Sequence, residues 1–119
     1  MKLFKCIIFY SQDNQDKYLE HNIFRGFKNR VFVDVGAHDG RSLNNTLYFE
    51  ENNGWKGISI EPIQKVYDRL VLNRPNCINL NYAVCNYDRE TEFIFNSGST
   101  EMISGIKETF GPRHMVRLQ

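Results

Sequence analysis

The sequence predicts an α/β fold in which a βαβαβ unit forms a parallel sheet with flanking helices. Apolar runs of strand length start at Val31, Trp55 and Cys77, and they alternate with segments in which apolar residues recur four positions apart, as on one face of a helix. The first of these runs passes directly into a turn that contains two glycines. Together these observations indicate a Rossmann-like sheet.

Residues 1–30 are expected to form a leading segment and a helix. Four apolar residues recur there at helical spacing and predict a helix that covers the sheet: Tyr18, Leu19, Ile23 and Phe27. The apolar stretch at the start of the chain is interrupted by a lysine and is too short to predict a signal peptide or a membrane span. We therefore expect no membrane partner.

The first predicted strand, residues 31–35, has the composition of a strand buried on both faces of a parallel sheet. Its Asp34 is costly to bury unless another group pairs with it. Gly36 and Gly40 then bracket a tight turn, where the missing Cβ atoms let a ligand approach the main chain. The chain from Ser42 onward is expected to be helical, so N–H groups would also point at the ligand. This pattern indicates a nucleotide-type cofactor site.

The spacing of the two glycines separates the common cofactor turns. A dinucleotide fingerprint needs Gly-x-Gly-x-x-Gly, whereas three residues separate Gly36 from Gly40, which disfavours a nicotinamide cofactor. A phosphate loop needs four residues between its glycines, then Lys-Ser or Lys-Thr, and is rejected. The Asp-x-Gly-x-x-x-Gly spacing resembles motif I of class I S-adenosylmethionine (SAM) dependent methyltransferases, although Ala37-His38 departs from it at the middle glycine. A turn that needs glycine for geometry alone is the remaining alternative.

A second carboxylate, Glu61, ends the next predicted strand about 20 residues after Gly40. An acidic residue at this place can accept hydrogen bonds from both ribose hydroxyls of a bound adenosine. Nucleotide and SAM sites share this feature, so it supports an adenosine ligand without choosing between them. Alone, Glu61 can equally cap the helix that follows Pro62. Together with Asp34 and the two glycines, it is predicted to contact the ligand.

The remaining elements follow in order. Leu43 and Leu47 mark a helix that Gly54 ends, and the next helix contains Val66 and Leu70 and stops at Arg74-Pro75. Residues 77–84 alternate as a third strand, and residues 92–95 form a short strand after a turn and can fold back as a hairpin. We expect one partial domain over 1–119, with the βαβαβ core and hairpin strand in 31–95 and a loop and tail in 96–119.

Several stretches of the chain, taken in order, resemble the FkbM-like methyltransferases. They are Tyr-Ser-Gln-Asp-Asn-Gln-Asp-Lys-Tyr-Leu at 10–19, Phe-Val-Asp-Val-Gly-Ala-His-Asp-Gly at 32–40, Ser-Leu-Asn-Asn-Thr at 42–46 and Gly-Trp-Lys-Gly-Ile-Ser-Ile-Glu-Pro at 54–62, with 79–84 and 104–106. The resemblance covers the chain from about Tyr10 to Phe110. The shared order and spacing make it specific.

This resemblance implies a Rossmann-like domain that binds SAM and methylates a hydroxyl group of a small-molecule or glycan acceptor. It places the methionine end of SAM against the glycine turn, the ribose at Glu61 and the adenine near 81–83. His38 stands where the family has Asn or His, and it is expected to pack within the turn. The implied cofactor-binding residues are Asp34, Gly36, Ala37, His38, Asp39, Gly40, Glu61, Pro62, Asn81 and Ala83. No residue is assigned as the general base.

Composition limits the other possibilities. The chain has 119 residues and a net charge of +1, which gives no electrostatic reason to expect nucleic acid. Its three cysteines lack Cys-x-x-Cys spacing, so neither a disulfide framework nor a zinc site is predicted, and a cytoplasmic setting fits best. The three histidines are dispersed, and no metal is expected.

The chain is short compared with the seven-stranded methyltransferase fold that the resemblance implies. In that fold another strand covers the far edge of the first strand, so we expect a truncated sheet in which residues 31–35 are an exposed edge. Such an edge invites pairing with another chain, so we expect a fragment of a longer protein, a short product with reduced or no activity, or a homodimer in which this strand pairs across the interface. Besides an active enzyme, two alternatives stay open: a SAM-binding remnant that has lost its acceptor half, and an unrelated nucleotide-binding α/β domain.

Overall fold

The computed structural model describes residues 7–88, 90–95 and 104–109. The chain divides into two compact units, Met1–Asn81 and Tyr82–Gln119. The first unit contains a three-stranded parallel sheet, and the second contains a two-stranded antiparallel sheet. Residues 96–103 and His114 lie outside the described residues.

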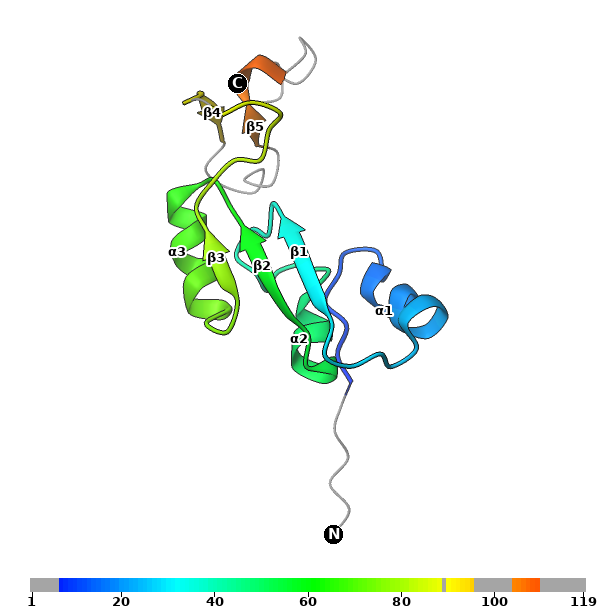
Figure 1. The fold of residues 1–119 in the computed structure, drawn as a ribbon. Coiled ribbons are helices and arrows are strands. Elements are labelled where there is room, and N and C mark those ends of the chain that lie inside the picture. The colour runs from blue at the N-terminus through cyan, green and yellow to red at the C-terminus, as the bar shows by residue number, and fades with distance from the viewer. Residues whose placement is uncertain (1–6, 89, 96–103, 110–119) are drawn as a thin grey trace. The chain divides into compact units, whose positions relative to one another are not determined.

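The sheet of the first unit has the order β1-β2-β3. Strand β1 (Val31–Val35) pairs in parallel with β2 (Lys56–Ile60), which pairs in parallel with β3 (Ile78–Leu80). Helices α2 (Leu47–Asn53) and α3 (Gln64–Asn73) make the two crossovers, as Figure 1 shows. The predicted βαβαβ order is confirmed, and the sheet is compatible with a truncated Rossmann-like fold.

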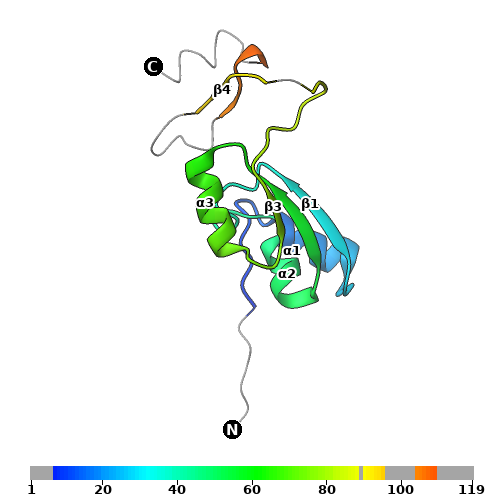
Figure 2. The same cartoon turned by 60° about the vertical axis from the view of Figure 1, so that its left-hand side comes forward.

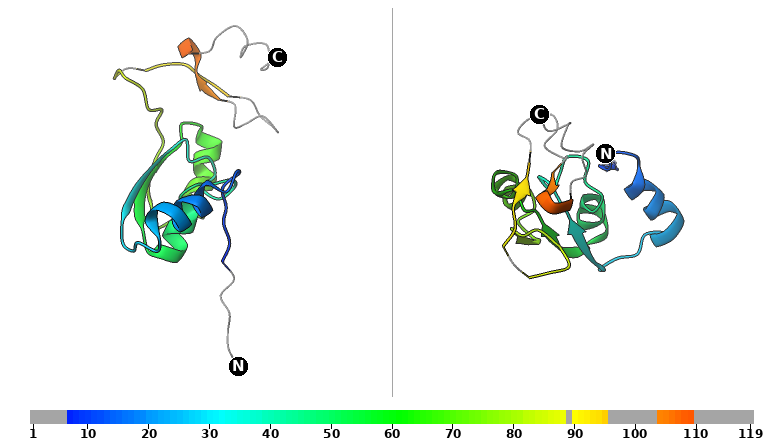
Figure 3. Two further views of the ribbon diagram at one scale, coloured as in Figure 1. Left: turned by 90° about the vertical axis from the view of Figure 1, so that its right-hand side faces the viewer. Right: turned by 90° about the horizontal axis from the view of Figure 1, so that it is seen from above.

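The helices lie on one side of this sheet, as the left view of Figure 3 shows. Val66 and Leu70 of α3 are fully buried, which confirms the predicted face of that helix. A second cluster forms where Tyr48 and Phe49 of α2 meet Trp55, with Phe32 of β1 packed against it. Aromatic side chains bury large apolar areas, so this cluster fixes α2 against the sheet.

The opposite face of β1 is exposed, and the prediction of a strand buried on both faces is wrong. Val31, Val33 and Val35 are 81%, 63% and 60% exposed. In the register, Val33 lies beside Ile58 and Val35 beside Ile60, so these apolar side chains share one face. No helix among the described residues of the first unit covers this face, which is turned toward the viewer in Figure 1 and obliquely to the right in Figure 2.

Helix α2 begins later than predicted. Residues 41–46 form a loop, Leu43 has a left-handed backbone with φ of +53°, and the helix starts at Leu47. The side chain of Asn44 holds this loop, because its Oδ1 accepts the backbone N–H groups of Thr46 and Leu47 directly before the helix. The helix ends at Gly54 as expected. With seven residues and a loop before it, α2 does not present the N–H groups that were predicted to face a ligand.

The leading helix exists, but it buries a different set of residues. It consists of α1 (Gln15–Leu19) and a π-helical segment η1 (Glu20–Phe24). Leu19 and Phe24 pack against the aromatic cluster, whereas the other predicted core residues are more than half exposed: Tyr18, Ile23 and Phe27. A π-helical turn contains more residues than an α-helical one and so shifts the side chains around the axis.

The amino-terminal motif has a structural role. Asp16 is fully buried and accepts hydrogen bonds from the backbone N–H and the hydroxyl of Ser11 and from the N–H of Tyr10. The Tyr10 hydroxyl donates to Glu51 at 2.5 Å, and this hydrogen bond is the main reason why the pKa of Tyr10 is raised. The motif therefore attaches the start of the chain to α2.

The second unit contains strands β4 (Phe93–Ile94) and β5 (Gly105–Ile106) and a 3-10 turn η2 (Lys107–Thr109). The two strands pair antiparallel, so the partner of β4 is β5, which follows it in the sequence. Strand β3 ends at Leu80, and the predicted continuation to residue 84 is not a strand.

Candidate cofactor site

The turn after β1 lies across the end of β2. The backbone N–H groups of Gly36 and Ala37 both donate to the Ile60 carbonyl, at 2.9 and 3.0 Å. Gly40 N–H closes the turn by donating to the Ala37 carbonyl at 2.9 Å. These hydrogen bonds hold the glycine turn at the carboxyl end of β2, directly before Glu61.

The two glycines of the turn are required for different reasons. Both have a left-handed backbone, with φ of +74° at Gly36 and +73° at Gly40. A Cβ at Gly40 would lie 2.5 Å from Leu70 Cδ1 and 2.6 Å from Arg74 Cγ, so packing excludes a side chain there. A Cβ at Gly36 would meet no atom within 4 Å. The space beside Gly36 is thus available to a ligand.

Glu61 connects the turn to the end of β2. Its Oε2 accepts the backbone N–H of His38 at 3.1 Å, and its Oε1 accepts the N–H of Ile63 at 2.9 Å. The residue is 5% exposed. A carboxylate has about four lone-pair sites, so each oxygen keeps capacity for a further hydrogen bond. The carboxylate is thereby held in one orientation at the edge of the sheet.

Asp34 points toward the loop that follows the turn. Its Oδ2 accepts hydrogen bonds from the side-chain amide of Asn44 at 3.0 Å and from the hydroxyl of Thr46 at 2.8 Å. These two donors supply the partners that a half-buried carboxylate needs. Asn44 also donates to the Ala37 carbonyl at 3.5 Å, so Asp34 and the turn share one polar neighbour.

His38 and Asp39 shape the turn itself. His38 has a φ of +52°, and its Nδ1 lies 3.6 Å from Asp39 Oδ1. Asp39 also accepts the N–H groups of Arg41 and Ser42 and the Ser42 hydroxyl. Burial alone raises the pKa of Asp39, but the hydrogen bonds from Ser42 and Arg41 and the nearby His38 outweigh it and lower the pKa below its ordinary value.

The remaining expected site residues fall into two groups. Asn81 is next to Glu61 in space, because its side-chain amide donates to the carbonyls of Glu61 and Pro62 at 2.8 and 3.2 Å. Glu61 N–H donates in turn to the Leu80 carbonyl, which ties β3 to this edge. Ala83 belongs to the second unit, so its place in an adenine site stays a prediction.

The sequence did not indicate that Asn44, Thr46 and Arg74 hold the site residues. Asn44 and Thr46 donate to Asp34, and Arg74 donates to the Gly40 carbonyl at 3.0 Å. The sequence feature that could have indicated Asn44 and Thr46 is that short polar residues interrupt the predicted helix after the turn. No such feature marks Arg74, because an arginine before a proline indicates only the end of a helix.

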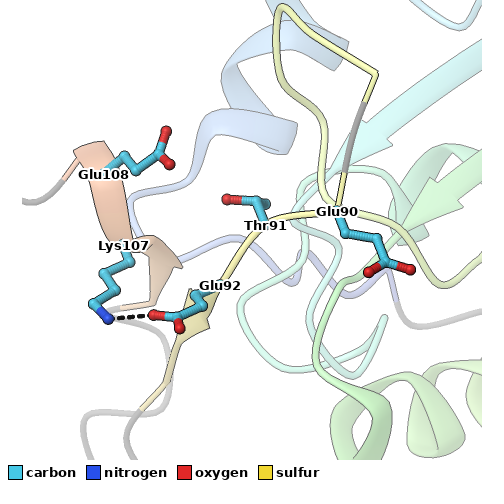
Figure 4. A pocket seen from close by; sticks show the side chains of 5 residues that line it. All are labelled: Glu90, Thr91, Glu92, Lys107 and Glu108. Carbon is cyan, nitrogen blue, oxygen red and sulfur yellow. Dashed lines mark hydrogen bonds and ion pairs between the residues drawn. The ribbon is translucent and has the colours of Figure 1, made fainter.

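An open groove of about 530 Å³ lies in the second unit, shown in Figure 4. The groove is lined by Glu90, Thr91, Glu92, Lys107 and Glu108. All of these except Thr91 are exposed, and Glu92 and Lys107 form an ion pair on the wall of the groove. The groove contains none of the expected cofactor residues.

The described ranges, 7–88, 90–95 and 104–109, contain neither a group of metal ligands nor a membrane-spanning helix. No three His, Cys, Asp or Glu side chains are grouped there closely enough to hold a metal ion. No helix in those ranges has the length and apolar composition needed to cross a membrane.

Comparison with known proteins identifies the family. No curated protein and no solved structure matches the chain significantly. The family model of the methyltransferase FkbM domain matches residues 34–115, which include every expected cofactor residue from Asp34 to Ala83. The match confirms the resemblance seen in the sequence and leaves no support for an unrelated nucleotide-binding domain. The chain belongs to the FkbM methyltransferase domain family.

Proposed function

We propose that the protein is a SAM-dependent methyltransferase that methylates a hydroxyl group of a small-molecule or glycan acceptor. The family match supports methyl transfer. The single observation that carries an adenosine cofactor is the hydrogen bond between the glycine turn and Glu61, and the family match favours SAM among such cofactors because methyl transfer needs a methyl donor. This hydrogen bond places two features at one edge of the sheet. One is the glycine turn, whose main chain a ligand can approach closely, and the other is a carboxylate that can accept hydrogen bonds from ribose hydroxyls.

The residues of this edge fit SAM in three respects. The space beside Gly36, which a Cβ would enter, can receive the amino-acid end of the cofactor. Glu61 has remaining lone pairs for ribose hydroxyls. Asn81, whose amide donates to the carbonyls of Glu61 and Pro62, would lie on the adenine side of the ribose. Asp34, which accepts hydrogen bonds from Asn44 and Thr46, would line the methionine end of the cofactor.

The chain contributes mainly alignment to such a reaction. SAM, when bound, supplies a methyl group on a sulfonium, which an acceptor oxygen can attack. Fixing the cofactor by the glycine turn and Glu61 removes much of the entropic barrier to that attack. A hydroxyl acceptor gains from a general base, and no described residue is assigned that role.

A second function is favoured by one observation. Among the described residues no strand pairs with the far edge of β1, and the valines of that strand leave an apolar face exposed, so a SAM-binding protein without turnover is the runner-up. The two functions share the cofactor site and differ in the acceptor site. Turnover with hydroxylated acceptors therefore decides between them.

We also propose a homodimer formed through the β1 edge. Arg30 carbonyl accepts the N–H of Lys56, and Gly36 N–H donates to Ile60, so the even-numbered residues of this segment face β2. Since N–H groups alternate along a strand, those of Val31, Val33 and Val35 point to the open edge. Unpaired edges of this kind pair with other chains.

A cytoplasmic setting is part of the same proposal. Cys77 and Cys85 are free thiols, and burial is the largest of the effects that raise the pKa of Cys77. A thiol that stays protonated and unpaired is suited to a reducing compartment.

Calorimetric titration with SAM and S-adenosylhomocysteine tests the proposed cofactor, with NAD as the control ligand. Binding of both SAM forms that Glu61→Ala abolishes, with no binding of NAD, supports the proposal. Preference for NAD would overturn it. Binding of SAM without methyl transfer to any hydroxylated acceptor would favour the runner-up.

A further inference from the structure

Arg74 is the most deeply buried cation among the described residues, with 1% of its surface exposed. A buried cation is costly unless paired and hydrogen-bonded. Its Nε donates to Glu50 Oε2 at 2.5 Å, and its guanidinium carbon lies 5.4 Å from the centre of the Phe32 ring. These contacts neutralise the charge, but they use only one of the five N–H donors.

The other donors reach the candidate cofactor site. Nη1 donates to the Gly40 carbonyl at 3.0 Å and to Asn44 Oδ1 at 3.1 Å, and Nη2 donates to Thr46 Oγ1 at 3.3 Å. A single side chain at the end of α3 therefore joins the glycine turn to the loop before α2. The planar fork of arginine can serve several acceptors at once, which lysine cannot.

These contacts orient the groups that hold Asp34. Arginine only donates, so Thr46 Oγ1 accepts from it and keeps its single proton for another acceptor. Asp34 Oδ2 lies nearer to that hydroxyl, at 2.8 Å, than Asn44 Oδ1 does, at 3.0 Å. Asn44 likewise accepts from Arg74 with its oxygen and donates to Asp34 with its nitrogen. Both side chains that donate to Asp34 thus accept from Arg74.

We propose that Arg74 is the positioning residue of the SAM site. It orients Asp34 through Thr46 and Asn44, and it fixes the Gly40 end of the glycine turn directly. This inference rests on the proposed cofactor. If Arg74 has only a structural role, its ion pair with Glu50 and its contact with Phe32 should be enough for the fold. The conformation of the glycine turn should then not depend on the hydrogen bonds from Nη1 and Nη2.

The test compares Arg74→Lys with Val66→Ala, which removes buried volume from the same helix without touching this network. The readouts are urea unfolding, SAM titration and the amide resonances of Gly36 and Gly40 in the ligand-free protein. Arg74→Lys should shift those resonances and weaken SAM binding by at least about tenfold, as expected for a lost charge-assisted hydrogen bond. Val66→Ala should lower the free energy of unfolding and change neither the two glycine resonances nor the affinity for SAM.

Thr46→Val is the second variant, because it removes one bridging hydroxyl and keeps Arg74 with its partner Glu50. It should reproduce the shifted resonances and part of the loss of affinity, even if Arg74→Lys fails to fold. Wild-type resonances and wild-type affinity in folded Thr46→Val would overturn the inference. Failure of the wild-type protein to bind SAM would reject the proposed cofactor, and the resonances would still show whether Arg74 positions the turn.

Discussion

The backbone N–H of His38 and the Oε2 of Glu61 are joined at 3.1 Å. This hydrogen bond connects the turn after β1 to the end of β2, so the carboxylate expected to hold a ribose also stabilises the turn. Its other oxygen accepts the N–H of Ile63. Substitutions at Glu61 should therefore affect both folding and the proposed cofactor binding, and the two effects have to be measured separately.

Replacement of Glu61 by Gln should weaken SAM binding by about tenfold, because one acceptor oxygen becomes a donor. The remaining oxygen can still accept one of the two backbone N–H groups, so the free energy of unfolding should fall by only about 1 kcal/mol. Calorimetric titration gives the first quantity and urea unfolding the second. Glu51→Gln, which changes a carboxylate bonded to Tyr10, is the matched control. Unchanged affinity in folded Glu61→Gln would remove Glu61 from the site.

The two glycines of the turn should respond differently to alanine. Gly40→Ala forces a Cβ against Leu70 and Arg74 at a positive φ, and should lower the free energy of unfolding by about 3 kcal/mol or more. Gly36→Ala meets open space, so its cost should be about 1 kcal/mol from backbone strain alone.

Only Gly36→Ala should then give a folded protein with greatly reduced affinity for SAM. Urea unfolding and SAM titration of both variants check this contrast. If Gly36→Ala bound SAM as the wild-type protein does, the space beside Gly36 would not be where the cofactor lies.

Features that depend on local sequence could be predicted. Helix α3 was predicted from the spacing of Val66 and Leu70 and from the proline that follows. The end of α2 was predicted from Gly54, which has a left-handed backbone in the structure. The carboxylates Asp34 and Glu61 stand at strand ends, and parallel strands bring such ends together whatever lies between them. This is why the closeness of Glu61 to the glycine turn could be expected from the sequence.

Features that depend on tertiary contacts could not be predicted. The loop before α2 is held by the side chain of Asn44, which also contacts Asp34. The exposed face of β1 was missed because a run of valines has the same pattern whether or not another element covers it. Arg74 is visible as a site residue only once Gly40 and Thr46 lie beside it.

Substitution at the open edge should test the proposed dimer. Val33→Pro removes an N–H that points away from β2, so the pairing of β1 with β2 should persist while pairing with a second copy is blocked. Sedimentation velocity should show a concentration-dependent dimer for the wild-type protein and for the control Val33→Thr, and a monomer for Val33→Pro. A wild-type protein that stays monomeric at high concentration would contradict edge pairing.

Asp39 should make stability depend on pH. Hydrogen bonds from Ser42 and Arg41 lower its pKa below the ordinary value of 3.8 despite its burial. A carboxyl group with a lower pKa in the folded state adds stability above the unfolded pKa, and this is lost as the pH falls through the folded pKa. Asp39→Asn should therefore be less stable than wild type near neutral pH, and the difference should shrink below pH 3.8.

Urea unfolding across this pH range measures the difference for Asp39→Asn. Asp68→Asn, which changes an exposed carboxyl on α3, controls for the loss of one charge. The donors to Asp39 come from the start of the loop that carries Asn44 and Thr46, so acid should also loosen that loop. The protection of the Ser42 amide, taken relative to its intrinsic exchange rate at each pH, should therefore decrease as the pH falls below the usual range for a carboxyl group. A stability difference that stays constant from neutral to acid pH would mean that the hydrogen bonds to Asp39 do not favour its ionised form.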